Sequence, residues 1–244
     1  MAAVRKTYGP LDCVAFPPSG GVAPRACVIL CHGYGAPGTD LVPLGFDLVA
    51  HRGPPRDQVQ LVFPAAPLSL DEIGLYGGRA WWPINMQELL DCYAHGDFDL
   101  LREQVPPGLD AAREAFLETL AAVQEETQLP LSRIVLGGFS QGAMLTTDTA
   151  LHLPESPAGL CILSGTLICE SRWRSLAPRH RGLPVLQSHG RADQILPVQA
   201  ARELRDLLTS SGLEVDYVEF PGPHTIPPEA LERVGAMIDR VASL

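Results

Sequence analysis

A serine lies between two glycines in the stretch GGFSQGAML, residues 137–145. The five residues GFSQG match the pattern GxSxG, in which a serine occupies a sharp turn between a strand and a helix. Such a turn strains the serine backbone, and side chains at the flanking positions would collide with the neighbouring strand and helix. Because RIVLG precedes the pattern and AMLTTDTALHL follows it, we interpret Ser140 as a nucleophile and not as a structural turn residue. Ser164 and Ser188 also follow apolar runs but lack the second glycine.

A serine hydroxyl needs a base that takes its proton during attack, and the chain has seven histidines. His224 lies in FPGPHTIPP, just after the last apolar run, where a loop at a strand end can reach the serine. We therefore predict that His224 is the base. His32 and His189 each precede a glycine at a tight turn and are interpreted as braces for their loops. The other four lie in helical or loop contexts with polar neighbours: His51, His95, His152 and His180.

The base in turn needs a carboxylate that orients its ring and stabilises the imidazolium. Asp193, in HGRADQILP, follows an apolar run and is predicted to lie at the same edge of the sheet. The chain order serine, aspartate, histidine is then that of α/β-hydrolases. Asp216 and Glu219 lie within a strand, and Asp148 lies two turns down the helix after the serine, so these three acids suit the role less well.

Acyl transfer also requires donors for the oxyanion of the tetrahedral intermediate, and backbone N–H groups supply them without reorganisation. We predict one donor at Gln141, directly after the nucleophile, where the helix dipole adds to the effect. The second donor is predicted at Tyr34, in the loop CHGYGAPG after the first parallel strand.

The elements that must position these residues alternate along the chain. Apolar runs of strand length occur at residues 26–33, 59–67, 133–140, 158–165, 183–190 and 214–220. Most of them do not alternate in polarity, which is typical of strands buried on both faces. Helical patterns lie between them at residues 41–52, 108–129, 143–153, 198–212 and 228–244. This order predicts one α/β domain over residues 1–244, with a mostly parallel central sheet flanked by helices on both faces.

One segment interrupts the alternation. The connection between one strand and the next long helix, residues 67–107, is about forty residues long, well above an ordinary connection length. The aromatic residues in this segment, with Tyr76 and the Trp81–Trp82 pair among them, supply burial that a disordered segment would lack. We interpret it as a cap over a substrate pocket at the strand ends, with plain packing as the alternative.

Composition excludes several classes of protein. The formal net charge is −10, so a nucleic acid backbone would meet like charge and is excluded as a partner. The chain shows no secretory signal and no run of eighteen uncharged apolar residues, from which we expect a cytoplasmic protein without stable membrane insertion. Its six cysteines form no CxxC pair, and we expect most to be reduced thiols in the core.

The motifs LCHGYGAPGTDL, FPAAP, GGRAWWPI, GGFSQGAM, SHGRADQILPV and PGPHTIPPE occur in this order. With them the chain resembles the phospholipase/carboxylesterase family of α/β-hydrolases, which includes the acyl-protein thioesterases, from about residue 26 to the C-terminus. The resemblance implies a compact α/β-hydrolase fold, hydrolysis of carboxylic esters or thioesters, and no metal or organic cofactor. It matches Ser140, Asp193 and His224 to the catalytic triad, and Tyr34 and Gln141 to the oxyanion positions. Acyl-protein thioesterases carry a leucine at the position of Tyr34, so a bulkier ring would narrow or polarise the entrance here.

The sequence thus predicts a serine carboxylesterase acting on small-molecule esters with short to medium acyl chains, as a monomer or homodimer. A lysophospholipase, a thioesterase, an acyltransferase and a ligand-binding relative without catalysis remain as alternatives. Substrate contacts are predicted for Tyr34, Trp81, Trp82, Gln141, Ile195 and Leu196.

Overall fold

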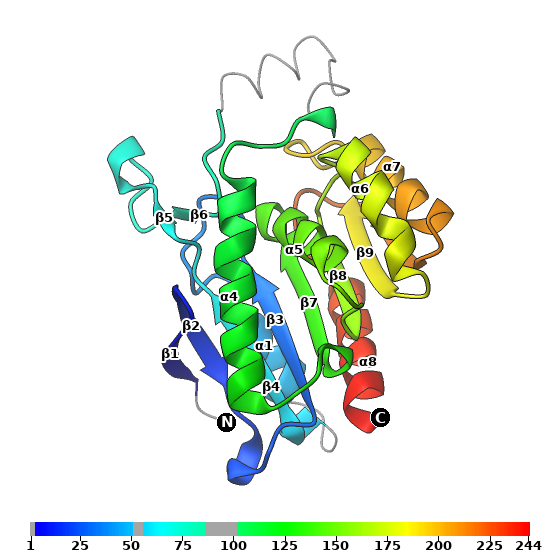
Figure 1. Cartoon of the computed structure of the whole chain (residues 1–244). Coiled ribbons are helices and arrows are strands. Elements are labelled where there is room, and N and C mark those ends of the chain that lie inside the picture. Colours follow the sequence, from blue (N-terminus) through cyan, green and yellow to red (C-terminus); the bar gives the residue numbers. More distant parts are fainter. Residues whose placement is uncertain (1–2, 51–55, 86–101) are drawn as a thin grey trace.

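A central sheet carries the fold in the computed structural model, which describes residues 3–50, 56–85 and 102–244. Its eight strands lie in the order β1-β2-β4-β3-β7-β8-β9-β10 (Figure 1). The first two pairings, of β1 with β2 and of β2 with β4, are antiparallel, and the other neighbours pair in parallel. The strands are β1 Val4–Tyr8, β2 Leu11–Phe16, β3 Ala26–Cys31, β4 Val59–Pro64, β7 Ile134–Phe139, β8 Gly159–Leu163, β9 Pro184–Gly190 and β10 Glu214–Phe220. The α/β-hydrolase fold expected from the sequence is confirmed.

The apolar runs become strands because both of their faces are covered. Every residue of β3, β4 and β8 is buried. Along β3, Cys27, Ile29 and Cys31 join one hydrophobic cluster, while Val28 and Leu30 join another on the opposite face. A strand buried on both faces cannot alternate apolar and polar residues, which explains the continuous apolar runs.

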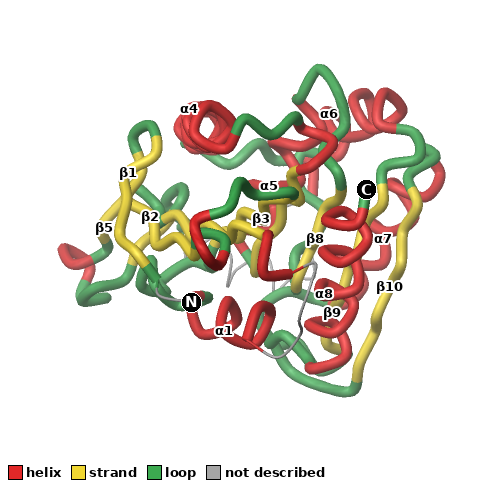
Figure 2. The backbone as a smooth tube through the Cα atoms, turned by 90° about the horizontal axis from the view of Figure 1, so that it is seen from below, coloured by secondary structure: helices red, strands yellow, loops and turns green. Residues whose placement is uncertain are grey.

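Helices cover each face of the sheet. The cluster on one face includes residues of α4, α5, α6 and α7, and the cluster on the other includes residues of α1 and α8. Figure 2 shows α4 and α6 on one side of the strands and α1 on the other. The helices are α1 Val42–Ala50, α4 Leu109–Thr127, α5 Gln141–His152, α6 Glu170–Leu176, α7 Val198–Ser210 and α8 Pro228–Ser243. Short 3-10 turns lie at Ser19–Gly21, Arg56–Gln58, Asp71–Ile73, Leu131–Arg133 and Ala177–His180.

Two elements in the connections between the strands of the central sheet were not among the helices and strands expected from the sequence. Helix α6 was not expected from the sequence, because its seven residues ESRWRSL are mostly polar, and only Trp173 is buried. The segment 67–107 begins with a two-stranded hairpin of β5 Leu68–Ser69 and β6 Arg79–Ala80. Its residues 86–101 lie outside the described residues.

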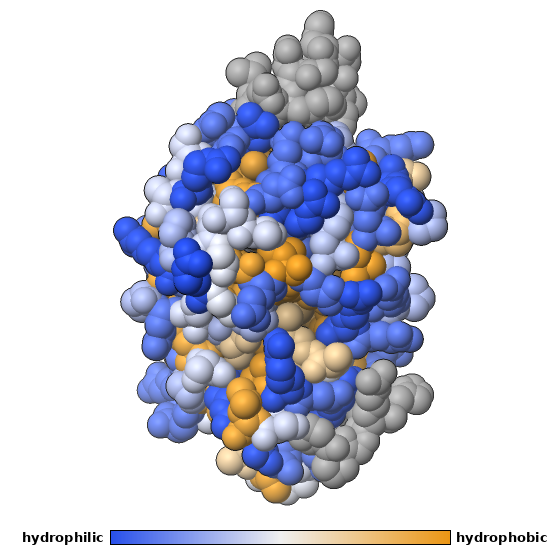
Figure 3. Space-filling model, turned by 90° about the vertical axis from the view of Figure 1, so that its right-hand side faces the viewer, coloured by the Kyte–Doolittle hydropathy of each residue, from blue (hydrophilic) through white to orange (hydrophobic). Residues whose placement is uncertain are grey.

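Strand β10 forms one edge of the sheet, and charged side chains occupy that edge. Arg202 forms two hydrogen bonds with Glu219, at 2.9 and 2.8 Å, and Arg233 forms an ion pair with Asp216. The side of the molecule with this edge is mostly hydrophilic, with small apolar patches (Figure 3). Charges along an edge strand oppose its pairing with another chain.

Candidate active site

The predicted nucleophile lies at the turn from β7 into α5. Ser140 has φ 54° and ψ −119°, outside the regions that residues other than glycine normally occupy. Its N–H donates to the carbonyl of Leu163 on β8 at 2.9 Å, which ties the turn to the neighbouring strand. The residue is 9% exposed. A strained serine held at the end of a central strand is the local geometry that GxSxG predicts.

The two glycines around the serine are required by the packing of this turn. A Cβ atom on Gly142 would lie 2.2 Å from the carbonyl oxygen of Cys31, at the end of β3. A Cβ on Gly138 would lie 2.6 Å from the same oxygen and 2.5 Å from the carbonyl carbon of Gly142. Both distances are far inside van der Waals contact, so the expected collision of flanking side chains with the strand and the helix is confirmed.

His224 lies beside the serine turn, on the loop that follows β10. Its ring centroid is 4.7 Å from that of Phe139, the residue just before Ser140. The loop is held in place from two sides: the Ser164 hydroxyl donates to the carbonyl of Thr225 at 3.0 Å, and the N–H of Ala192 donates to the carbonyl of Gly222 at 3.0 Å. The ends of β7, β8, β9 and β10 therefore meet at this site.

Asp193 is the partner of that histidine. Its Oδ2 accepts a hydrogen bond from Nδ1 of His224 at 2.7 Å, and its side chain is fully buried. Its Oδ1 accepts from the N–H groups of Ile195 and Leu196, at 2.9 and 2.8 Å. With Nδ1 as the donor, Nε2 of the ring is the atom left to accept a proton.

A second histidine also contacts this carboxylate. Nε2 of His189 lies 3.2 Å from Oδ2 of Asp193 and 2.8 Å from the carbonyl oxygen of Leu196. Burial by itself would raise the pKa of Asp193, but hydrogen bonds from His189, His224 and the N–H of Leu196 outweigh it and hold that pKa well below its usual range. The carboxylate stays ionised at neutral pH.

The alternative acids are engaged elsewhere. Asp148 is fully buried, and its carboxylate accepts from Arg113 at 2.7 Å and from the indole N–H of Trp173 at 2.8 Å. Asp216 and Glu219 form the ion pairs at the sheet edge described above.

His32 acts as a brace, as the sequence indicated. Its Nε2 accepts from the N–H of Ala66 at 3.0 Å, and its Nδ1 lies 2.8 Å from the carbonyl oxygen of Gly33. His189 braces its own loop through Leu196, but its contact with Asp193 was not expected, because spacing along the chain does not show where a ring points. His51 and His95 lie outside the described residues.

The two predicted oxyanion donors come from two segments that meet at the serine turn. The loop of Tyr34 packs against the turn, because a Cβ on Gly33 would lie 3.3 Å from the Cβ of Ser140. The neighbouring Gly35 donates its N–H to the carbonyl of Arg79 at 2.9 Å, which fixes this loop on the β5–β6 hairpin. Gln141 is the first residue of α5, where backbone N–H groups have no partner within the helix.

The side chain of Gln141 has a role that the sequence did not indicate. It accepts the N–H of Trp81 at 2.9 Å and donates to the carbonyl of Trp82 at 2.8 Å. These two bonds fasten the segment after β6 to the serine turn. The side chain is buried by this clamp, so only the backbone of Gln141 is available for an oxyanion.

Trp81 is a correction to the predicted substrate contacts. Its side chain is 1% exposed, its indole N–H donates to the carbonyl of His32 at 2.9 Å, and its ring packs edge-on to Phe116. The ring therefore packs in the core beneath the site, held by His32 and Phe116. Ile195 is also not part of the cavity wall, and the residue is 53% exposed.

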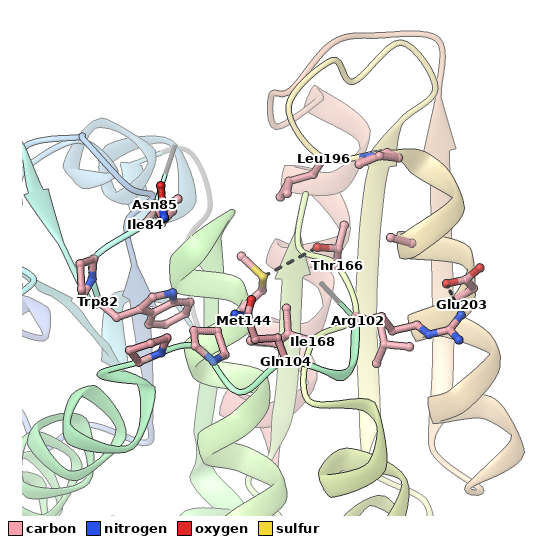
Figure 4. A pocket seen from close by; sticks show the side chains of 16 residues that line it. Trp82, Ile84, Asn85, Arg102, Gln104, Met144, Thr166, Ile168, Leu196 and Glu203 are labelled. Carbon is pink, nitrogen blue, oxygen red and sulfur yellow. Dashed lines mark hydrogen bonds and ion pairs between the residues drawn. The ribbon is translucent and has the colours of Figure 1, made fainter. Parts of the chain in front are cut away.

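A cavity of about 470 Å³ opens beside these residues (Figure 4). Its walls come from residues 82–85, the segment 102–107, Met144, residues 166–168 and residues 196–200. Three wall residues connect it to the site: Met144 donates its N–H to the carbonyl of Ser140, Leu196 donates to Asp193, and Trp82 accepts from Gln141. Most of its lining is apolar, and Arg102 lies at one end, paired with Glu203 and Glu170.

Within residues 3–50, 56–85 and 102–244, no cluster of three or more His, Cys, Asp or Glu side chains could hold a metal ion, and no helix is long and apolar enough to cross a membrane. Five cysteines within these ranges are free and buried, and burial raises the pKa of each thiol: Cys13, Cys27, Cys31, Cys161 and Cys169. Cys92 lies outside the described residues.

Known proteins share both the sequence pattern and the fold. The profile of the Phospholipase/Carboxylesterase family matches residues 18–242. Acyl-protein thioesterase 1 of Eremothecium gossypii is 30% identical, over 86% of this chain and 85% of its own length. Acyl-protein thioesterase 1 of Neurospora crassa is 28% identical, over 68% of this chain and 66% of its own length. The crystal structure of esterase PE8 superposes with a TM-score of 0.75 at 26% identity, covering 93% of this chain and 97% of that one.

Proposed function

The chain belongs to the phospholipase/carboxylesterase family and is a serine hydrolase of the esterase and thioesterase kind, and we propose that it hydrolyses carboxylic esters with short to medium acyl chains through an acyl-enzyme on Ser140. The observation that carries the proposal is the 2.7 Å hydrogen bond from His224 to the buried Asp193, next to a strained serine turn. The same geometry supports one domain over residues 1–244, because all three groups are held by one continuous sheet.

In the proposed reaction, Oγ of Ser140 attacks the carbonyl carbon of the ester while Nε2 of His224 takes its proton. The oxyanion accepts hydrogen bonds from the N–H groups of Tyr34 and Gln141. His224 then gives the proton to the leaving alcohol oxygen as the ester C–O bond breaks. A water molecule, deprotonated by the same ring, attacks the acyl-enzyme and releases the carboxylic acid and free Ser140.

Asp193 supports both proton transfers. Its carboxylate holds Nδ1–H of His224, so that Nε2 faces the serine, and its negative charge stabilises the imidazolium that forms in each step. The low pKa of Asp193 keeps the proton on the imidazole and not on the carboxylate.

We place the acyl chain in the cavity next to the serine turn, against Trp82, Met144 and Leu196. Its volume of about 470 Å³ lies within the usual range for small-molecule sites, roughly 300–1,000 Å³. Apolar walls favour an uncharged chain, and the charged groups at the Arg102 end would disfavour a long one because its terminus would meet paired charges.

A thioesterase is the second candidate, because the matched relatives are named acyl-protein thioesterase 1. The triad would attack a thioester in the same way. The two functions are separated by the ratio of kcat/KM for an oxygen ester and a thioester with the same acyl group, measured at several chain lengths.

The proposed nucleophile is tested with a fluorophosphonate probe, which labels activated serines. Ser140→Ala should abolish labelling and lower kcat by about 10⁴ to 10⁶, by analogy with triad knockouts in other serine hydrolases. Ser243→Ala, at an exposed serine near the end of α8, is the matched control and should label normally. Labelling that persists in Ser140→Ala would identify another serine as the nucleophile and overturn the proposal.

A further inference from the structure

His189 is a buried imidazole that the proposed reaction does not use. It lies on β9, its side chain is fully buried, and β9 pairs in parallel with β8 and β10. Its neighbour on the same face, Gln187, donates to the carbonyl of Ala201 on α7. His189 points in the same direction, toward the segment that leads from Asp193 to α7.

The contacts of His189 define its tautomer. Nε2 lies 2.8 Å from the carbonyl oxygen of Leu196, which can only accept, so Nε2 carries a proton. The same N–H is 3.2 Å from Oδ2 of Asp193, the oxygen that also accepts from His224 at 2.7 Å. Nδ1 of His189 is buried and has no hydrogen-bond partner among the described residues. All of the polar contacts of this ring are therefore directed at Asp193 and Leu196.

We propose that His189 is a positioning residue that holds Oδ2 of Asp193 in line with His224 and locks the carboxylate to the cavity wall at Leu196. This inference rests on the triad proposed above. Leu196 closes the arrangement, because its N–H donates to Oδ1 of Asp193 while its carbonyl accepts from His189. Two hydrogen bonds and the 3.2 Å contact of His189 with Oδ2 thus link the carboxylate, the turn residue and the imidazole on one side of the triad.

The contacts among Asp193, Leu196 and His189 have two consequences for catalysis. First, Asp193 accepts two hydrogen bonds at Oδ1 and one at Oδ2, and the N–H of His189 lies against Oδ2 as a longer contact, so its carboxylate cannot rotate without losing these interactions. Second, the donor from His189 competes with His224 for the same oxygen and lowers the basicity of that oxygen, which leaves the proton on His224. Among the described residues, the titratable side chains bonded to Asp193 are His189 from β9 and His224 from the loop after β10.

A purely structural brace would act differently. A brace needs only the bond to Leu196, and its loss would destabilise the loop without changing how activity depends on pH. A positioning residue must also change the pH dependence, because the basicity of Asp193 governs how strongly it stabilises the imidazolium.

The experiment compares His189→Gln, His189→Asn and His189→Leu in the full chain, with kcat and KM measured from pH 5 to 9. Glutamine carries an amide N–H at about the reach of Nε2, whereas asparagine is one methylene too short and leucine has no donor. The Asn and Leu variants should lose about 10- to 100-fold in kcat, as expected when a reacting group is misplaced by about 1 Å. The acidic limb of their pH–rate profiles should also move to higher pH, and the Gln variant should recover most of both.

His180→Leu is the control for folding. His180 is also a buried histidine, but it bonds Ser156 and the carbonyl of Leu151, away from Asp193. It should lower Tm comparably and leave the pH profile unchanged.

Three results would overturn the assignment of His189. One is a His189→Leu enzyme within twofold of the parent in kcat, and another is a His189→Gln variant that is folded but as slow as the Leu variant. The third is a loss of kcat with no shift of the acidic limb. If Ser140→Ala instead keeps its activity, the triad proposal itself fails, whatever the His189 variants do.

Discussion

Asp193→Asn is the substitution that tests the proton-handling arrangement most directly, because it replaces one carboxylate oxygen by an NH₂ group and leaves the shape of the side chain unchanged. The carboxylate accepts three hydrogen bonds, two of them from backbone N–H groups at Oδ1, and Nε2 of His189 lies 3.2 Å from Oδ2. An asparagine that keeps these two bonds must direct its NH₂ group at His224 and His189. Since an NH₂ group cannot accept, His224 must turn its Nδ1 into an acceptor and carry its proton on Nε2, and then it cannot act as a base.

The expected loss follows from this change of tautomer. The same substitution in the serine protease triad lowers kcat by about 10⁴. At about 1.36 kcal/mol for each tenfold change, that is about 5.4 kcal/mol of transition-state stabilisation. Folding should suffer much less. The loss of a hydrogen bond to a charged group costs about 1.5–3 kcal/mol, and removing a fully buried charge offsets part of this cost.

The assay is kcat for a chromogenic short-chain ester at pH 8, together with urea unfolding of the same preparation. Asp216→Asn is the matched control, since Asp216 is an exposed aspartate paired with Arg233 at the sheet edge. It should retain full activity. If Asp193→Asn, folded as shown by urea unfolding, keeps more than a tenth of the parent rate, then Asp193 does not set the tautomer of His224 and the proposed mechanism is wrong.

Three further outcomes are expected. The pKa of Asp193 is lower in the folded protein than its usual value of about 3.9, so its contribution to stability is complete at neutral pH and is lost as the pH falls below about 4. Urea unfolding of the parent between pH 3 and 6 should therefore show a free energy of unfolding that decreases as the pH falls. Asp193→Asn should weaken this pH dependence. Gln141→Ala keeps the oxyanion N–H but removes both bonds to the Trp81–Trp82 segment. We expect kcat to fall by 10-fold or more, up to the roughly 10²- to 10³-fold cost of a lost oxyanion donor. An unchanged kcat would show that the two bonds of the Gln141 side chain are dispensable. Gly142→Ala puts a methyl group 2.2 Å from the carbonyl oxygen of Cys31. It should destabilise the fold by at least the roughly 1–3 kcal/mol of an overpacked core, which is measured as a lower Tm. A Tm equal to that of the parent would contradict the steric explanation of the second glycine.

Local features of the site could be predicted from the sequence. The two glycines around Ser140 are required because a Cβ atom at either position would collide with the carbonyl oxygen of Cys31 on the neighbouring strand β3. The requirement can be recognised in the sequence because this type of turn brings the same backbone atoms together. The buried strands show as continuous apolar runs, and the order serine, aspartate, histidine places three groups at the carboxyl ends of strands in one sheet. The shape of the sheet then brings Asp193 and His224 together.

The contacts between distant segments were decided only by the tertiary structure. Trp81 was expected at the substrate, but its indole N–H bonds the carbonyl of His32 and its ring packs in the core against Phe116, while Gln141, sixty residues away, bonds its backbone. His189 was expected to brace a turn, and its ring also reaches the carboxylate of Asp193. Helix α6 is anchored to the core by Trp173, whose indole N–H donates to the buried Asp148.

Periodicity and motif spacing indicate the local requirements of a segment, such as a position with no room for a Cβ atom or a face that must be apolar. The direction of a side chain and its hydrogen-bond partner depend on strand register and on how helices pack over the sheet. Those distances are set by the whole chain at once, so His189 and Gln141 could be assigned their contacts only in three dimensions.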